Sequence, residues 1–193
     1  MSREESLSNT VFELLEKRFS PVIFSDKEVE DDKLFRLFEA ARWAPSSFND
    51  QPWNFIYGRK GKDQVYNTLF DLLMESNQVW AKYAPVLMLS VANMISPTTQ
   101  KENRFAFHDT GMAMGNMLVQ ATSMNIYIHQ MGGYSKKDAV DKLNIPQTHA
   151  PVAMIALGYR AGVKGFPDDL IKRDQKERTR RQIKDFAINS EFL

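Results

Sequence analysis

The chain of 193 residues has no cysteine. Disulfides, thiolate metal sites and cysteine nucleophiles are therefore excluded, which is typical of proteins from a reducing compartment. Neither sign of charge predominates, because 25 lysines and arginines stand against 24 aspartates and glutamates. The composition thus favours neither nucleic acid nor a membrane surface as a partner. The longest apolar runs, such as APVLMLSVA at 84–92, are too short to span a bilayer.

The N-terminal stretch MSREESLSNTVFELLEKR is acidic and amphipathic, unlike a signal peptide. We therefore expect a cytoplasmic protein. The length is sufficient for one domain with a full core, so we expect a single domain over residues 1–193.

The histidines give no sign of a metal site. His108, His129 and His149 are widely spaced and match no metal-binding pattern, so no metal is expected. His108 and Asp109 are neighbours on a predicted helix, where adjacent side chains point apart. We therefore expect no catalytic dyad there.

Apolar periodicity predicts a helix-rich chain with interspersed strands. Strands are expected at 54–59, 85–92, 126–130 and 150–160. Helices are expected at 11–19, 31–44, 62–77, 105–125 and 136–144, the second of them capped by Asp31 or Asp32. In the helix at 105–125, Gly111 and Gly115 would let another backbone come close. A mixed sheet covered by helices is the natural arrangement for this order of elements.

Two short stretches combine cations or amides with turn residues. In RFSP, Arg18 and Ser20 could grip a phosphate, although a solvated arginine and a capping serine are the simpler explanation. In APSSFNDQPW at 44–53, Pro45 ends a helix. The hydroxyl and amide groups that follow could bind their own backbone or a ligand, and the Gln51 amide could pair with the edge of a heterocycle. A packed loop explains the second stretch equally well.

Two later stretches are also ambiguous. In QMGGY at 130–134, paired glycines would allow a ligand close to the backbone, or would simply form a turn. The segment 168–185 has seven basic and five acidic side chains, which favours a mixed helix face over a nucleic-acid stripe. The apolar residues that follow, Phe186, Ile188, Phe192 and Leu193, need something to cover them.

Taken in order, these motifs resemble the FMN-dependent nitroreductase family. The matching pieces are RFS at 18–20, APSSFNDQPW at 44–53, NQVWAKYAPVL at 77–87, DTGMAMGNMLVQA at 109–121, GG at 132–133, LNIPQTHAPVAMIALGY at 143–159 and RTRR at 178–181. The likeness runs over almost the whole chain, and the string at 44–53 is its most specific part.

The resemblance implies an α+β fold with a central mixed or antiparallel sheet flanked by helices. It implies an intertwined homodimer with FMN at the subunit interface, in which about residues 165–193 pack on the partner. The implied activity is ping-pong hydride transfer from NADH or NADPH through the flavin to a nitroaromatic, a quinone or a similar flat acceptor. No catalytic side chain is required, because the cofactor carries the chemistry.

The resemblance also assigns the cofactor contacts. The first element and a late arginine would hold the FMN phosphate or ribityl chain, with Arg180 aligning best and Arg178 behind it. The 45–51 loop would lie along the isoalloxazine, Asn77 would reach the ring, and the 130–133 backbone would approach its reactive nitrogen. The full set is Arg18, Ser20, Pro45, Ser46, Ser47, Asn49, Gln51, Asn77, Gln130, Met131, Gly132, Gly133, Arg178 and Arg180.

The sequence departs from the family at two positions. Many members have a cation where Val22 stands, and some have a lysine where Trp80 stands. These cations usually lie near the pyrimidine edge of the flavin, and each could be worth about one to a few kcal/mol to the anionic reduced form. Their loss predicts a lower flavin potential than in members that keep them, unless a helix N-terminus or a partner residue compensates.

Three other functions remain open on the sequence. The same fold hosts dehalogenation, flavin destruction and dehydrogenation, because function depends on the substrate pocket. The missing cations slightly favour a flavin-binding or partner-binding protein without enzymatic activity. Nucleic-acid binding through residues 172–184 would require a steep salt dependence.

Overall fold

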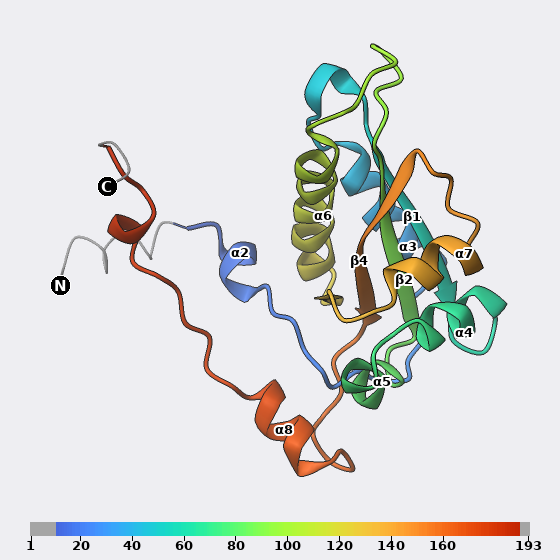
Figure 1. Ribbon diagram of the computed structural model, residues 1–193. Coiled ribbons are helices and arrows are strands. Elements are labelled where there is room, and N and C mark those ends of the chain that lie inside the picture. The colour runs from blue at the N-terminus through green and yellow to red at the C-terminus, as the bar shows by residue number, and fades with distance from the viewer. Residues whose placement is uncertain (1–10, 190–193) are drawn as a thin grey trace.

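A computed structural model describes residues 11–189 of the chain. Its centre is a sheet of β1 (Trp53–Arg59), β2 (Val86–Asn93), β3 (Tyr127–Met131) and β4 (His149–Gly158). The strands lie in the order β1-β2-β4-β3, and every neighbouring pair is antiparallel (Figure 1). The α+β class is thus confirmed, and the described sheet is antiparallel throughout.

The helices surround this sheet and connect its strands. They are α2 (Glu13–Lys17), α3 (Asp31–Arg42), α4 (Gln64–Asp71), α5 (Glu75–Ala81), α6 (Ala106–Ser123), α7 (Lys136–Lys142) and α8 (Asp168–Asp174). Two single 3-10 turns, η1 (Ser47–Asn49) and η2 (Ile183–Asp185), complete the described elements.

The two faces of the sheet are buried under different helices. In β2, Val86 and Met88 pack with α3 and α6, whereas Leu87 and Leu89 pack with α4, α5 and α7. Figure 1 shows α6 and α7 on opposite sides of the sheet. A strand covered on both faces needs apolar residues at successive positions, which explains the unbroken apolar run of β2.

The helix expected at 62–77 is two helices, α4 and α5, with a break between them. The break pairs with the glycine segment after β3. Leu73 forms an isolated bridge with Tyr134, and the Met74 N–H donates to the Gly133 carbonyl at 3.0 Å. Pairing with a distant segment therefore overrides a local helical pattern that has no proline or glycine to interrupt it.

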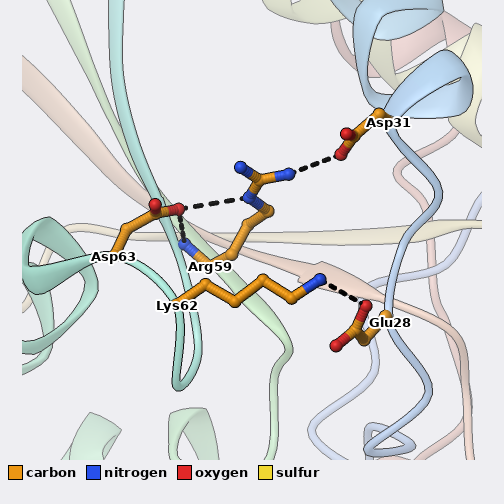
Figure 2. Close-up of polar contacts among 5 residues, drawn as sticks. All are labelled: Glu28, Asp31, Arg59, Lys62 and Asp63. Atoms are coloured by element: carbon orange, nitrogen blue, oxygen red, sulfur yellow. Dashed lines mark hydrogen bonds and ion pairs between the residues drawn. The ribbon is translucent and has the colours of Figure 1, made fainter.

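The start of α3 also differs from the expectation. Glu30 is the N-cap residue and makes no side-chain capping bond, so the prediction of Asp31 or Asp32 as the cap is wrong. Asp31 instead accepts a hydrogen bond from Arg59 at 2.5 Å, and Lys62 pairs with Glu28 at 2.6 Å (Figure 2). These contacts join the start of α3 to the turn between β1 and α4. These ion pairs are partly to largely exposed to solvent, so each contributes little to the stability of the fold. Their main effect is to position the start of α3.

One face of α6 has no covering segment among residues 11–189. Gly111 and Gly115 are exposed, and an added Cβ at either position would meet nothing within 4 Å. Phe107 and Met112 on the same helix are 49% and 40% exposed. The close backbone approach expected at these glycines is therefore not made within the described part of the chain.

The two ends of the described chain extend away from the body of the sheet and run beside each other (Figure 1). We call residues 11–20 and 175–189 the terminal arms. Arg178 Nη1 joins them by donating to the carbonyls of Glu16 at 2.8 Å and Arg18 at 2.7 Å. The helix predicted over 168–185 ends at Asp174, and most of the C-terminal arm is extended. Phe12 and Phe186 on the arms are 62% and 60% exposed.

A buried carboxylate fixes where the N-terminal arm joins the body. The Asp174 side chain is fully buried at the end of α8. It accepts from the backbone N–H groups of Val22 and Ile23 at 2.9 and 3.3 Å, and from Arg160 Nη2 at 2.6 Å and Nε at 3.1 Å. This one group ties together three segments that are far apart in the sequence.

Replacing this carboxylate should destabilise the fold. In Asp174→Asn, the amide NH₂ would face N–H donors, so buried donors would lose their acceptor. We expect a loss of about 3 kcal/mol in the free energy of unfolding. Urea unfolding at a fixed protein concentration measures this loss. Asp169→Asn removes the same charge from an exposed position of α8 and is the control. Equal stability of the two variants would contradict the prediction.

Candidate cofactor site

The four predicted phosphate contacts are brought together where the terminal arms leave the body. Arg18 Nη1 donates to Ser20 Oγ at 3.0 Å. Burial lowers the pKa of Arg18, and the nearby charges of Arg180 and Arg178 lower it further. We call Arg18, Ser20, Arg178 and Arg180 the phosphate cluster.

The phosphate cluster is electrostatically unbalanced. Within residues 11–189, none of its arginines forms an ion pair with a carboxylate. Arginines crowded together without a counter-ion repel one another, which is unfavourable unless an anion is bound. Guanidinium groups beside a hydroxyl suit a phosphate. The donor set therefore fits the phosphate of a nucleotide.

A second group forms where β3 ends and α5 begins. Asn77 Nδ2 donates to the Gly133 carbonyl at 3.0 Å. An added Cβ on Gly133 would lie 2.7 Å from the same nitrogen, so any larger residue would displace the amide. Gly132 is exposed, and an added Cβ there would meet nothing within 4 Å. An amide and bare backbone held beside open space can accommodate a flat ring.

The segment leading to these glycines has two faces. Gln130 is exposed, whereas the Met131 side chain is buried in the core. Met131 could therefore contribute its backbone to a ligand, but its side chain packs against the sheet.

A half-buried imidazole lies between the two groups. His129 Nδ1 donates to the carbonyl of Pro21 at 2.8 Å, next to the phosphate cluster. Its ring lies 4.4 Å from that of Trp80, one turn after Asn77 on α5. Sequence reasoning gave His129 no role. The sequence feature that could have indicated a role is the position of this histidine, within an apolar strand and just before the paired glycines.

Both positions at which the chain departs from the family belong to the core. Val22 is 2% exposed and Trp80 is fully buried. The Trp80 ring stacks on Phe24, and its indole nitrogen has no hydrogen-bond partner among the described residues. Neither side chain can replace a cation.

The 45–51 loop is held at the start of α6. The Ser47 N–H donates to Asp109 Oδ2 at 2.9 Å, and Ser46 Oγ accepts from the Gln51 N–H at 3.0 Å. Phe48, Asn49 and Gln51 have φ values of 53°, 56° and 47° in the left-handed region. Three such residues in one loop are costly, and strain of this kind is common at ligand sites.

This loop and the phosphate cluster lie at different ends of the molecule. In Figure 1, η1 lies at the upper end of the sheet beside the start of α6, whereas the chain after α2 runs down to α5 and α8. One chain therefore unites the phosphate cluster with segment 130–133 and Asn77, but it does not bring the 45–51 loop to them. This separation agrees with the resemblance, which implies a cofactor site at the interface of two subunits.

The expectation that His108 and Asp109 point apart is wrong. His108 Nδ1 lies 2.9 Å from Asp109 Oδ1. These residues occupy the first turn of α6, where no preceding turn restricts the histidine side chain. Asp109 is buried and uses its other oxygen to hold Ser47, while the His108 side chain is 69% exposed.

No group of three or more histidine, aspartate or glutamate side chains within residues 11–189 could hold a metal ion. No helix in this part of the chain is long and apolar enough to cross a membrane.

Comparison with known proteins gives consistent matches. A solved structure described as an oxidoreductase containing FMN is 33% identical and superposes with a TM-score of 0.87, over 95% of this chain and 93% of that one. A nitroreductase family protein of Streptococcus pneumoniae, at 21% identity, has the same fold, with a TM-score of 0.72 over 93% of this chain and 98% of that one.

A protein of Methanothermobacter thermautotrophicus, named provisionally as an NADH dehydrogenase/NAD(P)H nitroreductase, is 27% identical over 164 residues, which are 82% of this chain and 81% of that protein. The family model described as "Nitroreductase family" matches residues 15–159. The resemblance found in the sequence motifs is thereby confirmed, and the chain belongs to the nitroreductase family.

Proposed function

We propose that this protein is an FMN-dependent NAD(P)H oxidoreductase that passes two electrons to a flat acceptor such as a nitroaromatic or a quinone. The observation that carries the proposal is the phosphate cluster, whose arginines have no carboxylate partner among the described residues. The similar solved structure described as containing FMN supports the choice of nucleotide.

The residues present fit FMN at both of its ends. The phosphate cluster would bind the phosphate, while the Asn77 amide and the backbone of segment 130–133 would hold the ring. FMN, when bound, supplies the redox chemistry by accepting a hydride from NAD(P)H and delivering it to the acceptor. The protein's part is to orient the ring and to leave one face open to flat substrates, so no protein nucleophile is needed.

We propose further that the protein acts as a homodimer with two shared sites. The 45–51 loop and the phosphate cluster of the same chain lie at different ends of the molecule (Figure 1), which favours a loop that contacts the FMN of another protomer. In a dimer, the loop of one protomer would complete the site of the other. The uncovered glycine face of α6 and the exposed aromatics of the arms supply apolar surface for the contact. Residues from about 165 onward would pack on the partner.

The first test is spectroscopic. Protein purified with FMN should show bound-flavin absorbance, which NADH or NADPH should bleach under anaerobic conditions. A quinone or nitroaromatic should then restore it. Protein that binds FMN but is reduced by neither nucleotide would contradict the oxidoreductase proposal.

Paired variants test the assignment of the phosphate. Arg18→Ala combined with Arg180→Ala removes two charge-assisted contacts, so FMN affinity should fall about 100-fold or more. Riboflavin, which has no phosphate, should bind both proteins equally. Arg36→Ala, at an exposed position on α3, is the control and should keep the wild-type FMN affinity. Equal losses for FMN and riboflavin would show that the phosphate lies elsewhere.

A separate prediction concerns the dimer. Gly111→Phe adds bulk to the exposed face of α6, where an added Cβ would meet no described atom within 4 Å. We expect a folded monomer with weakened FMN binding, because the shared site would be incomplete. Sedimentation velocity measures the oligomeric state, and Asn67→Phe, at an exposed position on α4, is the control. A wild-type monomer, or a Gly111→Phe dimer, would overturn the proposal of a shared site.

A further inference from the structure

Arg173, in the last turn of α8, has no ionic partner in the described part of the chain, residues 11–189. Its guanidinium lies 5.5 Å from the centre of the Trp80 ring. It pairs with no carboxylate among residues 11–189. The adjacent carboxylate, Asp174, is already engaged by Arg160 and by two backbone N–H groups. The charge of Arg173 therefore remains available to a ligand.

Besides burial, the charges of Arg173 and Arg18 both lower the pKa of the His129 imidazole. Burial lowers the pKa of His129, and the charges of Arg173 and Arg18 lower it further, against the opposing effects of the Pro21 carbonyl and Asp174. His129 is accordingly neutral near pH 7. The positive potential between the phosphate cluster and α5 thus comes from the two arginines, and Arg173 lies on the side nearer Trp80.

The indole ring gives Arg173 a fixed place. A guanidinium within about 6 Å of a tryptophan ring centre is attracted to the ring face. Trp80 is fully buried and packs against Phe24 and His129. On α5 it follows Asn77 by one turn, and Asn77 is the residue proposed to reach the flavin ring.

We propose that Arg173 is the cation that stabilises the negative charge of the reduced flavin in this protein. It stands over the position, Trp80, at which some family members have a lysine, so the charge is supplied from α8 instead of α5. This inference rests on the proposed FMN site. It replaces the expectation of a lowered flavin potential, since a cation of the same chain compensates for the missing lysine.

The inference predicts a redox effect more than a binding effect. A cation near the ring favours the anionic reduced form over the neutral oxidised form. Arg173→Gln should weaken the binding of reduced FMN about tenfold relative to oxidised FMN. This change lowers the two-electron midpoint potential by about 30 mV. Arg173→Lys, which keeps the charge, should retain most of the wild-type potential.

The experiment is a redox titration of the FMN-saturated proteins with a reference dye, together with FMN affinities in both redox states. Lys172→Gln removes the same charge from the neighbouring exposed position of α8 and is the matched control. Thermal unfolding of the flavin-free proteins confirms that each variant is folded.

The outcomes separate this inference from the proposal on which it rests. A lowered potential in Arg173→Gln, but not in Lys172→Gln or Arg173→Lys, supports it. Equal potentials in the two glutamine variants, with FMN bound in both, overturn the inference and leave the proposed function intact. Failure of the wild type to bind FMN overturns both.

Discussion

The carboxylate of Asp174 is the contact on which the candidate site depends. It joins the backbone after the N-terminal arm, Arg160 two residues beyond β4, and the end of α8 through one cluster of hydrogen bonds. The arms that carry the phosphate cluster extend from this point in both directions along the chain. Together with the His129–Pro21 hydrogen bond and the contacts of Arg178 with the N-terminal arm, the Asp174 carboxylate holds Arg18 near the C-terminal arginines.

Near Asp174, the described residues include more arginines than carboxylates that pair with them. Arg160 is neutralised by Asp174, whereas Arg18, Arg178, Arg180 and Arg173 have no carboxylate within the described residues. His129 adds no charge, because burial and its arginine neighbours lower its pKa. Keeping several cations together with no counter-ion is unfavourable in the free protein and becomes favourable when an anion binds. The arginines of the phosphate cluster would favour a bound phosphate. Arg173 would favour an electron-rich ring.

Two features of the described chain support the proposed dimer. Its most specific motif, the 45–51 loop, is strained, exposed and anchored to Asp109 at the opposite end of the sheet from the arginines. The uncovered glycine face of α6 and the exposed aromatics of the arms are features that a lone globular subunit would normally bury. Strain and exposed apolar surface are both explained if a second copy supplies the missing wall.

The sequence by itself determined the family, the strands and most helices, because these follow from local motifs and from apolar patterns with a period of two or 3.6 residues. It also indicated which arginines, amides and glycines to consider. Only the tertiary structure decided that α4 and α5 separate opposite Tyr134, that His108 meets Asp109, and that Arg173 stands over Trp80. Each of these depends on contacts between side chains or between segments brought together by folding, and local periodicity contains no information about such contacts.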